Sequence, residues 1–313
     1  MVTYDAIIVG AGPAGLSAAL VLGRSCRSAL VFDDGRQRNT VTPEMHGLLS
    51  RDGMAPTEFL RLGREELRRY PSVTLLKARV THAVREGSEF SVRGGENGSH
   101  RARRLLLATG IDDVLPNIPG LREQWGVRVF VCPYCDAWEL RGKRLAVIGR
   151  GQRAVGLAQE LMRWSQALVV CTQSADDLTE DQRAWLRYAR LPVQTASINS
   201  LRRSADDALG LRFEDDTTIE CDAAFACTLA RQRSALVGML GCEIDAGGAI
   251  CIGGSGETSV PGCYAAGDAV TQIHQVVCAA ASGLAAAIGI NEALTEEETT
   301  ALLKRRENVP GEL

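Results

Sequence analysis

Two cysteines separated by two residues are the part of this sequence best suited to chemistry. Cys132 and Cys135 enclose Pro133 and Tyr134, and Asp136 follows directly. Cysteines at this spacing can close a disulfide with acceptable geometry, and the thiols of such pairs have depressed pKa values. The pattern therefore predicts a dithiol that cycles between a reduced and an oxidised form.

A zinc site is the alternative use of such a pair. Zinc would need two further ligands at matching spacing, and the sequence has neither a second Cys-x-x-Cys nor a paired His/Cys group. No metal is therefore expected. The other eight cysteines are expected to be buried, small apolar side chains in a protein of a reducing compartment, with Cys278 the one of further interest. These eight are Cys26, Cys171, Cys221, Cys227, Cys242, Cys251, Cys263 and Cys278.

The first residues predict a nucleotide-binding loop. An apolar strand over residues 4–9 leads into Gly10-Ala11-Gly12-Pro13-Ala14-Gly15, and a helix follows over residues 16–22. A second apolar run, residues 29–32, ends in Asp33 and Asp34. In such a βαβ unit the glycines let the backbone turn and approach a pyrophosphate, and the helix N-terminus faces the anion. We therefore expect dinucleotide binding here.

The same pattern returns later in the chain. The apolar run 145–148 leads into Gly149-Arg150-Gly151-Gln152-Arg153-Ala154, followed by a helix through Met162 and a strand over residues 167–171. Because Gly149 lies 139 positions after Gly10, the two units indicate two α/β nucleotide-binding domains, one inserted within the other.

The crossings between the domains are expected at prolines and glycines. Pro116 and the Pro119-Gly120 pair indicate one crossing, and the glycines between residues 240 and 248 indicate the other. The expected domains are residues 1–112 with 245–313, and residues 118–242 between them.

The C-terminal part predicts a short strand, an acidic loop and two helices. Residues 262–268 read as a strand that runs into a loop with Asp268. The charge-free stretch 269–291 contains several polar side chains and is dominated by alanine, so we expect a buried helix and no membrane span. Thr295-Glu296-Glu297-Glu298 is typical of a capping box and predicts a separate, short surface helix.

Composition limits the classes of partner. The 313 residues are 45% hydrophobic and 23% charged, which is enough apolar material for two domains with ordinary cores. The formal charge is −3 and no basic stripe is present, so nucleic acid is not an expected partner. The first apolar run leads directly into the glycine loop, so no targeting segment is expected and a cytoplasmic location is predicted.

Together these motifs resemble the low-molecular-weight thioredoxin reductase family of FAD flavoproteins, members of the pyridine nucleotide-disulfide oxidoreductases. The motifs that carry the resemblance are Gly10 to Gly15, Leu106-Leu107-Ala108-Thr109-Gly110, Cys132 to Asp136, Gly149 to Ala154, and Tyr264-Ala265-Ala266-Gly267-Asp268. Their order and spacing match over nearly the whole chain. The resemblance implies an α/β fold of two Rossmann-like domains of the three-layer ββα type, the second inserted in the first, and a homodimer. High-molecular-weight disulfide reductases are disfavoured, because their cysteine pair lies early in the FAD domain, where residues 35–50 have no cysteine.

The resemblance implies that FAD lies between residues 1–112 and 245–313. The glycine loop would hold the pyrophosphate, Asp33 in preference to Asp34 the adenosine ribose, and Asp268 the ribityl chain. The helix that starts near Gln275 would direct its N-terminal dipole at the flavin and stabilise the reduced, anionic form. The expected FAD contacts are Gly10, Gly12, Pro13, Ala14, Gly15, Asp33, Asp34, Asn39, His46, Ala108, Thr109, Gly110, Gly267, Asp268, His274, Gln275 and Val276. His274 replaces a usual arginine, and for both His274 and His46 a purely structural role is the competing interpretation.

Within the dithiol the resemblance assigns different roles to the two cysteines. Cys135 would meet the flavin, and Cys132 would exchange with the substrate. Because the attacking sulfur must be a thiolate, a nearby group has to accept and donate a proton, and Asp136 is the candidate.

The expected nicotinamide site departs from the family. NADPH-using members place arginines after the strand that corresponds to residues 167–171, whereas here Thr172-Gln173-Ser174-Ala175-Asp176-Asp177 follows. Two charge-assisted hydrogen bonds to a 2′-phosphate are worth about 2 to 4 kcal/mol, so NADPH affinity would fall by a factor of tens to hundreds. We therefore expect NAD(P)H to be a weak partner.

Other residues are similar to the gliotoxin- and holomycin-type dithiol oxidases of this family. These are the segment 35–53 and Cys-Pro-Tyr-Cys followed by Trp138-Glu139, although those oxidases commonly have histidine where this chain has Asp136. We predict an FAD-dependent thiol–disulfide oxidoreductase that exchanges electrons between FAD, Cys132–Cys135 and an external dithiol or disulfide. Its partner would be a thioredoxin-like protein or a small molecule.

Three other functions stay open. One is an NADPH-dependent thioredoxin reductase with an unusual phosphate contact through Arg150 or Arg153. Another is a reductase supplied by ferredoxin or by a second flavin. The third is a flavin redox sensor without turnover, which the intact Cys132–Cys135 pair disfavours.

Overall fold

The computed structural model describes residues 2–95, 98–174, 178–204 and 206–307. The chain forms two compact units. The first unit contains Met1–Thr40, Pro56–Asp112 and Arg231–Leu313, and the second contains Val41–Ala55 and Asp113–Ala230.

The unit boundaries lie at different residues from those expected. The chain returns to the first unit at Arg231, before the expected glycine-rich crossing, and residues 41–55 belong to the second unit. Residues 231–244 join the first unit because α7 (Leu236–Leu240) buries Leu236 and Val237 against Phe90. Strands β7 (Ile111–Val114) and β16 (Leu229–Gln232) pair with each other where the chain passes between the units.

The first unit is built on a seven-stranded sheet. Its order is β3-β2-β1-β6-β5-β4, and β17 also pairs with β6. Strand β6 has two successive partners within this sheet, because residues 99–102 pair antiparallel with β5 and residues 105–107 pair parallel with β17. The strands are β1 (Thr3–Val9), β2 (Ala29–Phe32), β3 (Val73–Leu76), β4 (Val80–Glu86), β5 (Glu89–Gly94), β6 (Ser99–Leu107) and β17 (Cys263–Ala265).

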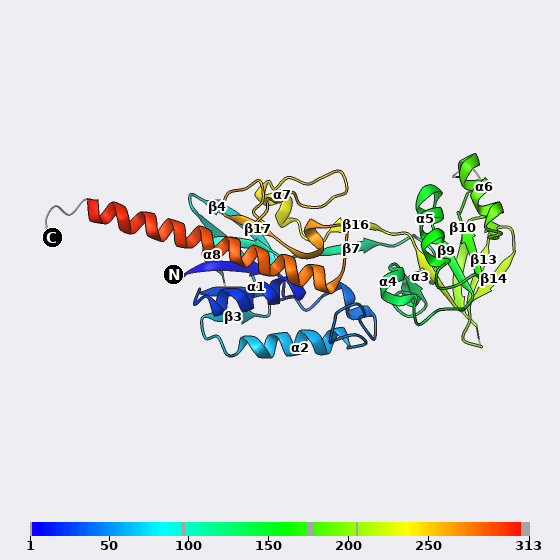
Figure 1. The fold of residues 1–313 in the computed structure, drawn as a ribbon, viewed down its shortest axis with the longest axis horizontal. Coiled ribbons are helices and arrows are strands. Elements are labelled where there is room, and N and C mark those ends of the chain that lie inside the picture. The colour runs from blue at the N-terminus through cyan, green and yellow to red at the C-terminus, as the bar shows by residue number, and fades with distance from the viewer. Residues whose placement is uncertain (1, 96–97, 175–177, 205, 308–313) are drawn as a thin grey trace. The chain divides into compact units, whose positions relative to one another are not determined.

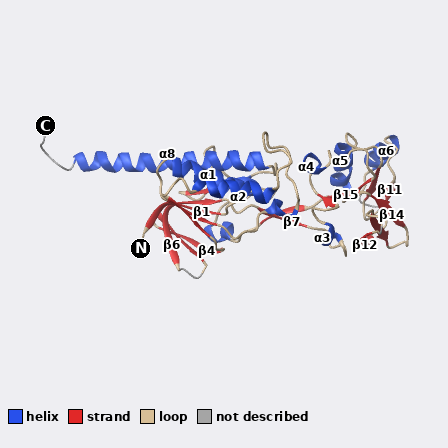
Figure 2. Ribbon diagram, turned by 90° about the horizontal axis from the view of Figure 1, so that it is seen from below, coloured by secondary structure: helices blue, strands red, loops and turns tan. Residues whose placement is uncertain are grey.

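Alternate residues of these strands face two different cores. Ala6 and Ile8 of β1 pack under the helices, whereas Ile7 and Val9 pack toward β4, β5 and α7. This alternation is the period of two that a strand imposes. The helices α1 (Pro13–Arg24), α2 (Pro56–Leu67) and α8 (Val276–Glu307) cover one face of the sheet (Figure 2). The unit therefore has one core between the sheet and the helices and a second core on the opposite face of the sheet, in the mixed α/β fold that was expected.

Helix α8 is a single helix of 32 residues, so the prediction of a separate helix after Thr295 was wrong. The Thr295 hydroxyl donates to the carbonyl of Asn291 inside the helix and does not cap a new one. Ion pairs hold the distal turns: Glu298 meets Arg27 and Arg103, each at 2.6 Å. Arg27 and Arg103 thus hold the carboxylate of Glu298 against the first unit beyond Thr295.

The N-terminal half of α8 packs closely on α1 (Figure 1). A Cβ at Gly283 would lie 2.0 Å from the carbonyl oxygen of Ala14, so only glycine allows this approach. The helix is long and apolar enough to cross a membrane by length and composition. Ala286, Ala287, Ile290 and Leu294 are nevertheless fully buried in the core of the unit, whereas Leu284 and Ile288 are exposed, so the expected burial is confirmed for one face of the helix.

The second unit repeats the plan on a smaller scale. A five-stranded parallel sheet has the order β11-β10-β9-β15-β8, and a three-stranded antiparallel sheet, β12-β13-β14, covers one face of it. Helices α5 (Gly151–Leu161) and α6 (Glu180–Tyr188) cover the other face. The strands are β8 (Val129–Phe130), β9 (Leu145–Ile148), β10 (Leu168–Cys171), β11 (Val193–Gln194), β12 (Ile198–Arg203), β13 (Leu209–Phe213), β14 (Thr218–Cys221) and β15 (Ala223–Ala226), and two short helices are α3 (Leu121–Gln124) and α4 (Pro133–Asp136).

Candidate functional site

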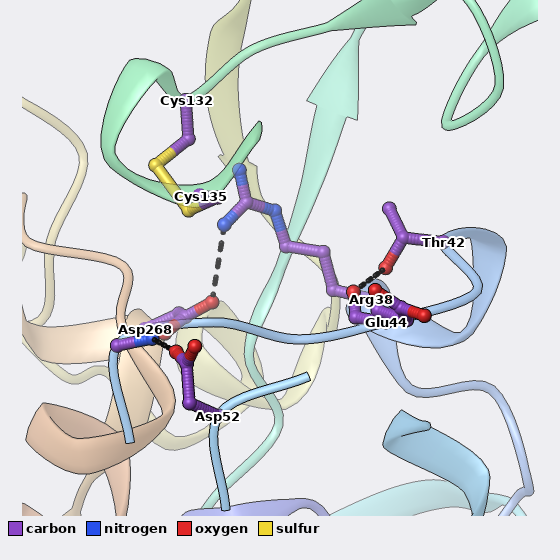
Figure 3. The surroundings of a disulfide bond; sticks show 8 residues. Arg38, Thr42, Glu44, Asp52, Cys132, Cys135 and Asp268 are labelled. Carbon is purple, nitrogen blue, oxygen red and sulfur yellow. Dashed lines mark hydrogen bonds and ion pairs between the residues drawn. A yellow bond between two sulfur atoms is a disulfide. The ribbon is translucent and has the colours of Figure 1, made fainter. Parts of the chain in front are cut away.

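Cys132 and Cys135 form a disulfide in the second unit (Figure 3). Cys132 is extended and precedes α4, and Pro133 starts that helix with its φ already set for it. The two Cα atoms are 5.3 Å apart, within the range that a disulfide needs. The helix holds the two sulfurs together because the amides of Cys135 and Asp136 both donate to the carbonyl of Cys132, at 3.1 and 3.2 Å.

Asp136 is the last residue of α4 and directly follows the disulfide. Burial raises the pKa of its carboxyl to about 7, with the nearby charge of Glu139 adding to the rise and that of His46 opposing it. A carboxyl group with this pKa can both accept and donate a proton near neutral pH. This is the property that the predicted acid–base role of Asp136 requires.

His46 belongs to the second unit, and not to the unit that carries the glycine loop and the other predicted FAD contacts. Its ring lies among carboxylates: Nδ1 is 3.5 Å from Asp52, and Nε2 is 3.7 Å from Glu44 and 3.8 Å from Glu139. Segment 41–55 is held in this unit by close contact, because a Cβ at Gly126 would lie 2.7 Å from the carbonyl of Val41. Within the second unit, His46 therefore lies near Glu139 and Asp136.

Two aromatic side chains beside the disulfide are exposed, and sequence reasoning did not assign them a role at the site. Tyr134 is 69% exposed and Trp138 is 63% exposed. Tyr134 packs edge-on against Trp164, and the guanidinium of Arg141 lies 4.3 Å above the Trp138 ring. Two large, exposed aromatic side chains therefore lie close in sequence to the disulfide within the second unit.

The first glycine loop has the geometry that a pyrophosphate site needs. Gly10 has φ +109°, and a Cβ there would lie 2.2 Å from the carbonyl of Ala108. A Cβ at Gly15 would lie 1.8 Å from the carbonyl of Gly10, so this glycine allows α1 to pack on the strand. At Gly12, by contrast, the nearest atom to a Cβ is 3.9 Å away, in the side chain of Gln37. The space above Gly12 is thus open, as required for a phosphate to approach the backbone.

The N-terminus of α1 is available to an anion. Pro13 is its first residue, no side chain caps it, and its first turn contains no acidic residue. Its dipole therefore favours a negative charge in front of Gly12 and Ala14. The Thr109 hydroxyl at the end of β6 is buried and has no hydrogen-bond partner among the residues that the structure describes. An orphaned buried hydroxyl beside Ala108 and Gly110 fits a site that a polar cofactor completes.

Asp33 is buried at the end of β2 and is already well supplied with donors. Its Oδ1 accepts from the Gly35 amide and from Gln37, both at 2.8 Å. Its Oδ2 accepts from Arg64 of α2 at 2.9 and 2.8 Å. Asp34 instead pairs with Arg36 at 2.8 Å. A ribose hydroxyl would therefore compete with Gln37 and Arg64 for this carboxylate, and neither residue was assigned a role from the sequence.

The acidic loop after β17 lies close to the first glycine loop. A Cβ at Gly267 would lie 3.0 Å from that of Ala14, and the Ala266 amide donates to the carbonyl of Leu107 at 3.1 Å. Asp268 forms an ion pair with Arg38 at 3.4 Å (Figure 3). The predicted residues Gly10 to Gly15, Ala108 to Gly110 and Gly267–Asp268 are therefore together in the first unit. Asn39 lies in the short helix Arg38–Val41.

His274 and Gln275 immediately precede α8, which begins at Val276. The Nε2 atom of His274 lies 2.9 Å from the carbonyl oxygen of Thr271, and the Gln275 carbonyl accepts from the Ala279 amide at 2.9 Å. Gln275 thus stands at the helix start, where the sequence placed it.

The second glycine loop joins β9 to α5, with Arg150 extended before the helix. A Cβ at Gly149 would lie 2.6 Å from the Cys227 sulfur, so this glycine packs against the end of β15. Arg153 donates to the carbonyl of Thr228. Beyond β10 the structure describes Thr172, Gln173 and Ser174, while Ala175, Asp176 and Asp177 lie outside the described residues.

Burial of the remaining cysteines was predicted only in part correctly. Cys171, Cys221, Cys242 and Cys263 are buried, whereas Cys227, Cys251 and Cys278 are half-buried and Cys26 is exposed. Cys26 follows α1 with φ +56°, in a turn that carries its side chain away from the core. Among the described residues no group of three or more His, Cys, Asp or Glu side chains is placed to hold a metal.

Comparison with known proteins agrees with this geometry. The sequence profile of the pyridine nucleotide-disulphide oxidoreductases matches residues 4–283. The chain belongs to this family. Thioredoxin reductase tcpT of Claviceps purpurea is 31% identical over 290 residues, covering 89% of this chain and 90% of that protein. Among curated relatives, thioredoxin reductase sirT of Leptosphaeria maculans is also 31% identical, covering 92% and 93% of the two chains.

Solved structures of this family are also similar. The crystal structure of HlmI has a TM-score of 0.92 and 36% identity, covering 98% of this chain and 97% of that one. Putative thioredoxin reductase TrxB of Bacillus anthracis has a TM-score of 0.89 and 34% identity, covering 94% and 99%. The chain is thus a flavin oxidoreductase of the thioredoxin reductase type that acts on disulfides through a Cys-x-x-Cys pair, and FAD is the cofactor expected of the family.

Proposed function

We propose that this protein oxidises a dithiol to a disulfide through Cys132–Cys135 and FAD, passes the electrons to oxygen, and does not use NADPH efficiently. The overall reaction is R(SH)₂ + O₂ → RS₂ + H₂O₂. A small-molecule dithiol is the substrate we favour over a thioredoxin-like protein. HlmI, a holomycin dithiol oxidase, supports this choice as a relative with 36% identity.

The observation that carries the proposal is the end of β10. Thr172 is fully buried, and its hydroxyl donates to the carbonyl of Ser174 at 2.8 Å. No guanidinium group follows the strand from Thr172 to Asp177 in the sequence. Bidentate arginines are the usual means of binding a phosphate monoester. A 2′-phosphate would therefore find no cationic partner on this stretch of chain.

The residues of the second unit account for the thiol chemistry. A substrate thiolate attacks one sulfur of the Cys132–Cys135 disulfide, and a mixed disulfide forms as the S–S bond breaks. The second substrate thiol then displaces the enzyme sulfur and leaves as the cyclic or linear disulfide product. The carboxylate of Asp136 accepts the proton that the substrate dithiol loses, because its pKa of about 7 suits both states.

The first unit would hold the cofactor. Gly12 and the N-terminus of α1 would face the pyrophosphate, Thr109 would bond the cofactor with its orphaned hydroxyl, and Asp268 with Arg38 would border the ribityl chain. Bound FAD supplies a two-electron acceptor that reoxidises the dithiol. A role for Asp33, Asp34, Asn39, His274, Gln275 and Val276 in the same site belongs to this proposal.

The test compares electron donors for the flavin of the holoenzyme. Stopped-flow reduction under anaerobic conditions would follow the flavin absorbance after mixing with NADPH, NADH or dithiothreitol. We expect fast bleaching by dithiothreitol and bleaching by NADPH at least tens of times slower. Fast, stoichiometric bleaching by micromolar NADPH contradicts the proposal.

An NADPH-dependent thioredoxin reductase is the second candidate, because the second glycine loop keeps its strand–loop–helix form. Arg150 precedes α5 there, at a place from which a guanidinium could meet a phosphate. If NADPH bleaches the flavin and Arg150→Ala prevents it while Arg153→Ala does not, this candidate replaces the first.

The oligomeric state and the cellular location of the protein are also part of the proposal. We infer a cytoplasmic homodimer that binds neither nucleic acid nor membrane. Light scattering on the purified holoenzyme would test the dimer, and cell fractionation would test the location.

A further inference from the structure

A second pair of sulfur atoms lies in the first unit, apart from the redox disulfide. Cys242 and Cys263 are 21 positions apart in sequence, and their Sγ atoms are 4.0 Å apart. Cys242 follows the left-handed Gly241 that ends α7, and Cys263 is the first residue of β17. The two thiols are thus brought together by the fold and not by a local sequence motif.

This pair differs from the other buried cysteines of the chain. Both sulfurs lie in the core on the sheet face opposite the long helices, where Cys263 is fully buried and Cys242 is 8% exposed. The Thr258 hydroxyl oxygen lies 3.6 Å from the Cys242 sulfur, so Cys242 has two polar neighbours in an otherwise apolar site. The contact with the Cys263 thiol lowers the pKa of Cys242 to about 7, and the same contact together with burial raises the pKa of Cys263. One thiolate shared by two sulfurs is a good nucleophile near neutral pH.

We propose that Cys242 and Cys263 are a second oxidisable dithiol, which hydrogen peroxide converts to a disulfide. The Cys242 thiolate attacks one peroxide oxygen, the O–O bond breaks, and a sulfenic acid and water result after protonation. The Cys263 thiol then attacks the Cys242 sulfur and displaces a second water. Two thiols lose two electrons and two protons in total, and one peroxide becomes two waters.

The location gives this oxidation a structural consequence. Strand β17 runs from Cys263 directly into Ala266, Gly267 and Asp268, the loop proposed to border FAD. The Thr258 amide donates to the Cys263 carbonyl at 2.8 Å, and the Cys242 amide donates to that of Val237 at 3.0 Å. A disulfide would therefore tether the end of α7 to the strand that carries the cofactor loop.

The sequence allows the bond to be identified by mass spectrometry. Combined cleavage by trypsin and a Glu-specific protease yields peptide 234–243 with Cys242 as its only cysteine, peptide 244–257 with Cys251, and peptide 258–292 with Cys263 and Cys278. The full-length holoenzyme is reduced, freed of reductant, treated with hydrogen peroxide in excess over both cysteine pairs, alkylated and digested without reductant. Adding peroxide makes the result independent of how the protein itself handles oxygen.

We expect peptide 234–243 joined to peptide 258–292, two hydrogens lighter than the sum of the reduced peptides. Cys278→Ser should keep this species, and Cys263→Ser should lower it at least tenfold and leave a Cys242 sulfenic acid that dimedone traps. Cys251→Ser is the matched control and should change nothing. The proposal is overturned if wild-type Cys242 stays fully alkylated after peroxide, or if Cys242 is found joined to Cys251 or Cys278.

Discussion

The imidazole Nε2 of His46 lies 3.8 Å from the Glu139 carboxylate, and Glu139 is three residues beyond Asp136 in the same unit. Asp52 at 3.5 Å and Glu44 at 3.7 Å surround the same ring. His46 is therefore surrounded by carboxylates, and both His46 and Glu139 affect the pKa of Asp136, the proposed proton acceptor. The charge of His46 favours the ionised form of Asp136, whereas Glu139 and burial oppose it.

The first prediction concerns the pH dependence of dithiol oxidation. Because the carboxylate of Asp136 accepts the proton, kcat/KM should rise as pH increases through about 7, the pKa of that group. Asp136→Asn should lower the rate by about 10²- to 10⁴-fold and remove this part of the profile. Rates measured with dithiothreitol between pH 5 and 9 would check it, and an unchanged profile in Asp136→Asn would exclude Asp136 as the acceptor.

His46→Gln provides the matched control for that experiment. Removing the His46 ring takes away an interaction that lowers the pKa of Asp136, so the midpoint of the profile should move to higher pH while turnover at high pH persists. A midpoint that does not move, or moves down, contradicts the electrostatic link between the two residues.

Asp136 should also make folding stability depend on pH. Its pKa in the folded protein is about 7, above the ordinary value of 3.8, so the fold favours the neutral acid. The stabilising contribution is therefore complete below pH about 4 and is lost as pH rises through about 7. Urea unfolding at several pH values should show this decline in the wild type and a flatter curve in Asp136→Asn.

The disulfide cysteines should be separable from the other cysteines by substitution. Cys132→Ser and Cys135→Ser should each lower dithiol turnover by about 10³-fold or more, since each removes a sulfur that takes part in exchange. Cys251 is half-buried and lies outside the pair, so the Cys251→Ser variant should keep wild-type turnover. Retention of wild-type turnover in Cys132→Ser would contradict the assignment of the Cys132–Cys135 pair to the reaction.

The sequence predicted strands well where burial on both faces makes them continuous apolar runs. Residues 29–32 and 145–148 became β2 and β9 with the predicted ends, because every side chain of both is buried. It predicted the end of α8 wrongly because the capping-box pattern at Thr295 is local, whereas the partners of Glu298 are Arg27 and Arg103, far away in the chain.

The residues of the candidate site could also be predicted only where a local sequence pattern indicates them. The turn of the first glycine loop could be predicted, because the spacing of its glycines is itself typical of a pyrophosphate-binding turn. The donors to Asp33 could not be predicted in this way. Arg64 belongs to α2, and no sequence pattern indicates that this helix lies beside the end of β2. The place of His46 depended on which unit residues 41–55 join, and no motif in that segment indicates it.

Two glycines of the first loop should respond differently to alanine. Gly12 has φ −77° and open space around its Cβ position, so Gly12→Ala should cost the apoprotein only about 1 kcal/mol as a helix cap but weaken FAD binding by obstructing the pyrophosphate. Gly15→Ala would place a Cβ 1.8 Å from the carbonyl of Gly10 and should prevent a stable fold. Thermal melts of the apoproteins and FAD titration of Gly12→Ala would check this, and wild-type FAD affinity in Gly12→Ala would refute the proposed pyrophosphate position.

The ion pairs of Glu298 at the distal end of α8 should contribute little to the free energy of unfolding at neutral pH, and this contribution should disappear at low pH. Arg27 and Arg103 lower the pKa of Glu298 to about 2, below the ordinary 4.5, so the contribution is present above pH 4.5 and is lost as pH falls through about 2. Because the Glu298 side chain is 42% exposed and screened by solvent, Glu298→Gln should cost only about 0.5 to 1 kcal/mol. Glu296→Gln, which removes an exposed carboxylate from the same helix, is the control for the loss of a negative charge alone.

Electron entry tests the central claim most directly. The purified holoenzyme would be titrated anaerobically with NADPH and then with dithiothreitol, while the flavin absorbance is recorded, and air would be admitted at the end. The absence of arginine from residues 172–177 of the sequence and the presence of the Cys132–Cys135 pair predict no prompt bleaching by NADPH, full bleaching by about one equivalent of dithiothreitol, and hydrogen peroxide on reoxidation. Stoichiometric bleaching by NADPH, or reoxidation by air without peroxide, would contradict the account.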